Sequence, residues 1–100
     1  MKIFVSYTTR DNSINLKILK ELNFVLSDYG QVYIDLIHND SIDKQKRVFS
    51  ELEVCDLVLL VETKNTFKSK WVKIELDRAK KLKKRVIKIR LNKLLDIIRK

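Results

Sequence analysis

Four short runs of apolar, β-prone residues alternate with four longer stretches of helical periodicity, and this alternation constrains the possible folds more than any other feature of the sequence. The runs predict strands near residues 3–7, 31–36, 57–62 and 86–90. The stretches predict helices near residues 14–27, 41–54, 70–84 and 91–100. Strands that alternate with helices form a parallel sheet with helices on both faces. We therefore expect a flavodoxin-like, three-layer α/β/α fold.

The composition of the four runs also predicts their order in the sheet. The first and third runs, Ile3–Tyr7 and Leu57–Val61, are the most apolar and are therefore placed at the centre. Lys88 interrupts the fourth run, which favours a position at the edge. The resulting order is 2-1-3-4, and it reverses between strands 1 and 3. Ligands of such sheets bind at this reversal, beyond the carboxyl ends of the strands.

The helical periodicity predicts which side chains face the sheet. Phe24, Ile42 and Ile74 belong to the apolar sets of the first, second and third helices. Gly30, the only glycine, follows the first helix at a position where a left-handed residue is expected. Ser69 precedes the third helix, and we expect it to act as the N-terminal cap of that helix.

Length and composition set aside several classes of protein. One hundred residues predict a single domain, residues 1–100. The longest apolar run, Leu57–Val61, is too short to cross a membrane, and the first residues resemble a strand rather than a secretory signal. Cys55 is the only cysteine, so no intramolecular disulfide can form, and with a single histidine we expect no dedicated metal site. These features favour a cytoplasmic location.

The distribution of charge is the strongest anomaly of composition. The formal net charge is +9, and residues 51–100 carry +8 of it, most of the excess lying between Arg78 and Arg90. Such a cluster attracts anions, and we expect weak, non-specific binding of polyanions there. The alternative is that these side chains form an ordinary solvated helix face. No aromatic residue interrupts the cluster, so stacking of nucleic-acid bases is not indicated.

The reversal of strand order selects candidate functional residues without reference to any family. Tyr7, Arg10 and Asp11 follow the first strand, and Trp71 and Glu75 share one face at the start of the third helix. A carboxylate with an aromatic side chain beside it and an arginine opposite would form a small polar pocket. The structural alternatives are that Trp71 packs on the sheet, Glu75 complements the helix dipole and Asp11 caps a helix.

Four short motifs follow one another along the chain. They are Phe4-Val5-Ser6-Tyr7 followed by Asp11, Tyr33-Ile34-Asp35, Cys55-Asp56-Leu57-Val58-Leu59, and Ser69-x-Trp71-x-x-x-Glu75-Leu76. Together they extend over about residues 3–90. In content and order they resemble the motifs of the TIR (Toll/interleukin-1 receptor) domains found in bacteria, and the resemblance implies the same flavodoxin-like fold.

The resemblance also implies an activity. Many TIR domains cleave NAD⁺ at the nicotinamide glycosidic bond, and such a domain would act in antiphage defence or virulence. NAD⁺ would then be the substrate, with no bound cofactor. Glu75 matches the catalytic carboxylate, which would stabilise oxocarbenium-like charge as nicotinamide leaves. The implied substrate-binding residues are Tyr7, Arg10, Asp11, Asp35, Ser69 and Trp71.

Three other functions remain open at this point. Some TIR domains are non-catalytic interaction modules that bind a second copy or another TIR-like domain. The loop Leu36–Ser41 is short and lacks the usual glycine or proline of the loop through which TIR enzymes assemble, which argues against both self-assembly and catalysis. A nucleoside deoxyribosyltransferase-like enzyme would also be flavodoxin-like and use a carboxylate at this site. Nucleic-acid binding through the Arg78–Arg90 cluster is the third possibility.

Overall fold

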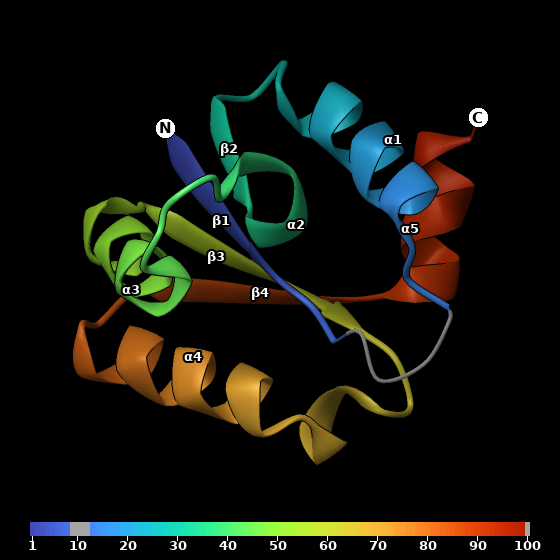
Figure 1. Cartoon of the computed structure of the whole chain (residues 1–100). Coiled ribbons are helices and arrows are strands. Elements are labelled where there is room, and N and C mark those ends of the chain that lie inside the picture. Colours follow the sequence, from blue (N-terminus) through green and yellow to red (C-terminus); the bar gives the residue numbers. More distant parts are fainter. Residues whose placement is uncertain (9–12, 100) are drawn as a thin grey trace.

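The computed structural model describes residues 1–8 and 13–99, and its centre is a four-stranded sheet (Figure 1). The strands are β1 (Lys2–Ser6), β2 (Gln31–Ile34), β3 (Leu57–Glu62) and β4 (Arg85–Arg90). All three neighbouring pairs are parallel, and the order is β2-β1-β3-β4. The predicted direction and order of the strands are both confirmed.

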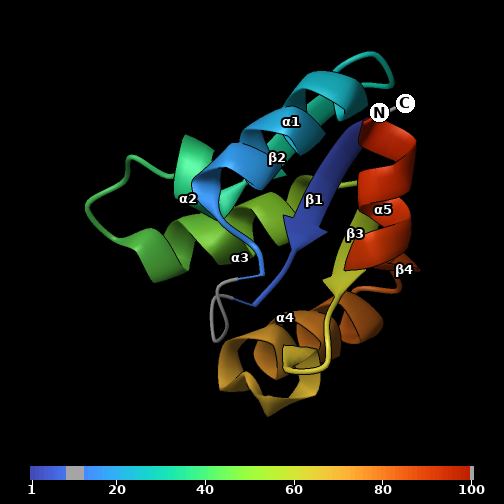
Figure 2. The ribbon, with the colours of Figure 1, turned by 90° about the vertical axis from the view of Figure 1, so that its right-hand side faces the viewer.

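Helices cover both faces of this sheet. They are α1 (Leu16–Leu26), α2 (Asp35–His38), α3 (Lys44–Val54), α4 (Lys70–Lys81) and α5 (Leu91–Ile98), with a short 3₁₀ turn, η1 (Thr66–Lys68), before α4. Figure 2 shows α1 and α5 together on one face, whereas α3 and α4 lie on the other. The arrangement is the predicted three-layer α/β/α fold of the flavodoxin type. Within the described residues, no helix is long and apolar enough to cross a bilayer.

The alternation of side chains along the central strands divides the core into two layers. Ile3 and Val5 of β1 pack with the residues of α1 and α5, whereas Phe4 packs with those of α3 and α4. Residues 58–61 of β3 are all buried, as expected for a strand covered on both faces. No residue of β4 is buried, which agrees with its position at the edge.

The second strand and the second long helix are shorter than the sequence predicts. The strand ends at Ile34, and Asp35 begins α2 instead of ending the strand. The Ile34 N–H donates to His38 Nδ1 (2.8 Å), a local hydrogen bond that accompanies the turn from β2 into α2. Helix α3 begins at Lys44 because Asp43 caps it, its Oδ1 accepting from the Lys46 N–H (3.0 Å).

Three apolar residues that we predicted to face the sheet are exposed. Phe24 is 80% exposed, Ile74 is 42% exposed, and Ile42 lies before α3 and is fully exposed. In α1 and α4 the error has a common geometric cause. Phe24 and Ile74 each follow a buried residue by two positions, a rotation of about 200° around the helix axis. The buried stripes are therefore narrower than the apolar pattern indicates.

The left-handed residue expected at Gly30 occurs instead at Lys83, whose φ is 56°. Gly30 has a positive φ of 158°, which lies outside the left-handed helical region but is rarely adopted by L side chains. It is a glycine because a Cβ there would lie 2.2 Å from the carbonyl oxygen of Met1. Lys83 follows α4, and the N–H groups of Lys83 and Lys84 donate to the carbonyls of Lys80 (3.1 Å) and Ala79 (2.9 Å). This pair of bonds is a Schellman motif.

Replacing Lys83 with glycine should stabilise the domain by roughly 0.5–1 kcal/mol, because glycine adopts the left-handed conformation without the steric cost of a Cβ. Urea denaturation of both proteins measures the difference. Lys81→Gly is the matched control: it removes the same charge from within α4 and should destabilise by a similar amount. A Lys83→Gly variant less stable than the parent would contradict this explanation of the helix end.

Candidate functional site

A small cavity of about 120 Å³ lies at the carboxyl ends of β1 and β2, beside the start of α4. Its lining consists of Val5, Tyr7, Asp35, Ser69, Trp71 and Glu75. Five residues predicted from the sequence are therefore brought together around one cavity. The other two, Arg10 and Asp11, lie outside the described residues. The elements meet here because parallel strands direct all their carboxyl ends to the same edge of the sheet.

The residue at which α4 begins determines which of its side chains face the sheet and the cavity, and Glu75 is one of them. Ser69 caps the helix as predicted, its Oγ accepting from the N–H of Val72 (3.3 Å). Glu75 then falls on the stripe of α4 that faces the sheet, together with Val72 and Ala79, and is only 4% exposed. A carboxyl group that the sequence could assign to the helix dipole is thus buried in the interior.

The environment of Glu75 favours its neutral form. Burial raises the pKa of its carboxyl to about 8, a hydrogen bond donated by Ser6 Oγ to Oε1 (3.0 Å) acts against this rise, and the charge of Asp35 adds to it. The carboxyl is therefore largely protonated at neutral pH. A cation entering the cavity would favour ionisation, since the positive charge would compensate for the lost solvation.

Tyr7 contributes a neutral hydroxyl group to the cavity. Burial raises the pKa of its phenol to about 12; a hydrogen bond from the Leu36 N–H to its oxygen (3.1 Å) opposes the shift, whereas the charges of Asp35 and Glu75 increase it. Tyr7 therefore remains a phenol at physiological pH. The same hydrogen bond ties the end of β1 to the start of α2.

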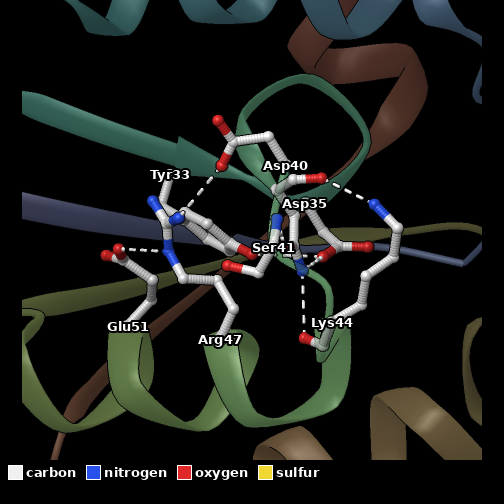
Figure 3. A network of polar contacts seen from close by, with 8 residues as sticks. Tyr33, Asp35, Asp40, Ser41, Lys44, Arg47 and Glu51 are labelled. Atoms are coloured by element: carbon white, nitrogen blue, oxygen red, sulfur yellow. Dashed lines mark hydrogen bonds and ion pairs between the residues drawn. The ribbon is translucent and has the colours of Figure 1, made fainter.

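Asp35, the second acid of the cavity, is held by a polar network (Figure 3). Its Oδ1 accepts from the Tyr33 hydroxyl (3.1 Å) and from Asn39 Nδ2 (2.6 Å). Asn39 is buried, and it bonds in both directions with Lys44: Nδ2 donates to the Lys44 carbonyl (3.0 Å), and Lys44 Nζ donates to the Asn39 carbonyl (2.7 Å). Asp35 is thereby fixed relative to the start of α3.

Arg47 makes three contacts on the outer side of this network. Arg47 Nε donates to Glu51 (3.0 Å), its guanidinium lies 5.6 Å from the centre of the Tyr33 ring, and it approaches Asp40 at 3.5 Å (Figure 3). Burial and the neighbouring charge of Asp35 raise the pKa of the Tyr33 phenol, so Tyr33 stays a hydrogen-bond donor to Asp35. The segment between β2 and α3 is therefore well anchored.

The sequence did not identify two residues that shape the site. Ser6 is the one polar residue within the apolar run of β1, and alternation places it on the same face as Phe4, toward α4. A single polar residue in an apolar run indicates a buried hydrogen-bond partner, and this could have linked Ser6 with Glu75. Asn39 has no such signal, because its role depends on a fold of the chain that only the structure reveals. Trp71 lines the cavity and also packs against Phe49, with ring centres 5.9 Å apart.

Two residues of the predicted basic cluster, Lys84 and Arg78, make structural contacts near the end of α3. Lys84 Nζ donates to the carbonyls of Glu53 and Cys55 (2.8 Å each), and so binds the carboxyl end of α3. Arg78 pairs with Glu53 at 3.4 Å and lies over the Phe49 ring. Among the residues that the structure describes, no group of three or more His, Cys, Asp or Glu side chains is arranged to hold a metal ion.

The fold and the cavity define a flavodoxin-like α/β domain with a buried carboxyl group, that of Glu75, on α4. The family model described as TIR domain matches residues 3–99, and the chain therefore belongs to the TIR domain family. A comparison with curated proteins gave no match.

Proposed function

We propose that this TIR domain hydrolyses NAD⁺ at the nicotinamide glycosidic bond. The observation that carries the proposal is the burial of Glu75 in a cavity that also contains Asp35, Tyr7 and Trp71. The nicotinamide ring of NAD⁺ is flat and positively charged, so an aromatic wall and two acids suit it. The cavity has room for such a ring rather than for a whole dinucleotide, which agrees with recognition of one end of the substrate.

In the proposed reaction the protein stabilises the positive charge that develops on the ribose. The bond between the ribose C1′ and the nicotinamide nitrogen breaks, its electron pair neutralises the ring, and positive charge develops on the ribose. Ionised Glu75 stabilises that charge, while Ser6 holds the carboxylate through its hydroxyl group. Water then adds to C1′ and loses a proton, giving ADP-ribose, nicotinamide and H⁺.

Incubation with NAD⁺ followed by chromatography tests the proposal. We expect free nicotinamide to accumulate at high protein concentration, and heat-denatured protein to give none. NADH is the informative control substrate, because its reduced ring carries no positive charge and should not be cleaved. Absence of nicotinamide at every protein concentration would reject the proposed activity.

A non-catalytic interaction module is the alternative within the same family, since TIR domains often associate with other TIR domains. In that case the domain would bind a second copy or another TIR-like domain and release no nicotinamide. In either case we propose a cytoplasmic role in defence or virulence signalling. The lone, buried Cys55 is compatible with a reducing compartment.

Polyanion binding is a second candidate property, favoured by the exposure of the basic cluster. Its exposed cations are Arg78, Lys80, Lys81, Lys83, Arg85, Lys88 and Arg90. We expect weak binding to heparin and to DNA of any sequence, and the logarithm of the binding constant should fall linearly with the logarithm of salt concentration. Tight binding to one DNA sequence at high salt would contradict this expectation.

A further inference from the structure

The carboxylate of Asp35 is hydrogen-bonded through only one of its oxygens. Its Oδ1 accepts from both the Tyr33 hydroxyl (3.1 Å) and Asn39 Nδ2 (2.6 Å), as Figure 3 shows. Among residues 1–8 and 13–99, no hydrogen bond or ion pair reaches the other oxygen, Oδ2. Because Asp35 lines the cavity of Glu75, this second oxygen remains for a ligand in that cavity.

The side chain of Asn39 is itself held at both ends. Besides its bond to Asp35, Nδ2 donates to the Lys44 carbonyl (3.0 Å), and the Asn39 Oδ1 accepts from the Ser41 N–H (3.2 Å). The backbone N–H of Asn39 also donates to the Asp35 carbonyl (3.0 Å). Two acceptors surround one end of the buried amide and a donor meets the other, so the amide has a single favourable orientation. Its bond to Asp35 therefore fixes the direction of the carboxylate.

The direction of this carboxylate matters because the other acid of the cavity is largely neutral. Burial raises the pKa of the Glu75 carboxyl to about 8, against the hydrogen bond from Ser6, and the charge of Asp35 adds to the rise. The lining that the structure describes includes no basic side chain. The charge of Asp35 is therefore the one that a cation meets on entering the cavity.

We propose that Asn39 and Tyr33 are positioning residues, which hold Asp35 so that the cavity binds a cationic ring more tightly than a neutral one. The choice of ring rests on the proposed function, in which the ligand carries a positively charged nicotinamide. Neither Asn39 nor Tyr33 lines the cavity, so both act through Asp35. Without these bonds the carboxylate is free to adopt other rotamers, and its charge no longer stays at the cavity.

The test compares 1-methylnicotinamide, whose ring nitrogen is positively charged, with neutral nicotinamide. Neither contains a glycosidic bond, so their binding is measured independently of hydrolysis. Trp71 is the only tryptophan and lines the cavity, so quenching of its fluorescence reports binding. We expect the intact domain to bind the cation at least about tenfold more tightly than the neutral ring. Equal binding of the two rings, or no binding of the cation, would overturn the proposal.

Two substitutions remove the bonds to Asp35 one at a time. Asn39→Ala and Tyr33→Phe should each weaken binding of the cation by at least about threefold and leave binding of nicotinamide unchanged, since hydrogen bonds to a charged group are the stronger ones. Tyr33→Phe keeps the buried ring that stacks on Phe4 at 5.4 Å, so it decides the outcome where Asn39→Ala does not fold. Unchanged selectivity for the cation in a folded variant would overturn the proposal.

Lys44→Met is the control that separates positioning of Asp35 from anchoring of the segment. It removes the bond from Lys44 Nζ to the Asn39 carbonyl but no bond to Asp35. The domain should melt at a lower temperature, while binding of neither ring should weaken. A loss of cation binding equal to that in Tyr33→Phe would overturn the proposal. If the parent binds the cation selectively but does not cleave NAD⁺, the proposed function is rejected and the positioning roles stand.

Discussion

Replacing Glu75 with glutamine should abolish release of nicotinamide from NAD⁺ while the domain stays folded. Glutamine keeps the shape of the side chain, and its oxygen can still accept the hydrogen bond from Ser6 Oγ. The substitution removes only the negative charge that would stabilise the developing cation. We expect the rate to fall by roughly 100-fold to 1000-fold, the range found when one preorganised electrostatic contact is removed.

Glu62→Gln is the matched control for this prediction. Glu62 is a partly buried carboxylate at the end of β3, it does not line the cavity, and it pairs only loosely with Arg90, at 3.9 Å. Loss of the Glu62 charge should leave nicotinamide release nearly unchanged. If the parent protein cleaves NAD⁺ and Glu75→Gln retains full activity, Glu75 takes no part in the mechanism. If the parent is inactive and Glu75→Gln melts at a lower temperature, the carboxyl has a structural role.

The fold could be predicted because its main determinants are local and periodic. The apolar runs of β1 and β3 identify the central strands, and the charge of Lys88 within the fourth run identifies an edge. The predictions failed where local geometry departs from the pattern. The strand β2 ends at Ile34 because Asp35 begins α2, and the Schellman motif at Lys83 has no glycine. Phe24 and Ile74 lie off the buried stripes of their helices.

The candidate site could be predicted only in part, because some of its contacts join residues that are far apart in the sequence. Tyr7, Asp35 and Glu75 follow from the topology, because each lies near the carboxyl end of a strand or the start of the helix that follows one. The contact of Ser6 with Glu75 joins residues 69 positions apart, and that of Asn39 with Asp35 depends on how α2 ends. Such contacts arise from packing, which a one-dimensional pattern does not contain.

The contribution of Glu75 to the stability of the domain should fall as the pH rises from about 4.5 to about 8. In the unfolded chain its carboxyl has the ordinary pKa of 4.5, whereas burial, opposed by Ser6 and assisted by Asp35, raises it to about 8 in the folded domain. The folded state therefore binds the proton more tightly. The contribution of the Glu75 carboxyl to stability is fully present below about pH 4.5 and is lost as the pH rises from there to about 8.

Glu75→Gln removes this titration, so the difference in unfolding free energy between variant and parent isolates it. Urea denaturation at intervals between about pH 5 and about pH 9 should show the variant gaining on the parent by at most about 1.4 kcal/mol per pH unit, with no further gain above about pH 8. Groups common to both proteins that do not interact with Glu75 cancel in the difference. A difference that is constant across this range would mean that Glu75 is already ionised in the empty cavity. A variant that is more stable at alkaline pH but inactive toward NAD⁺ would indicate that burial of this carboxyl serves function at the expense of stability.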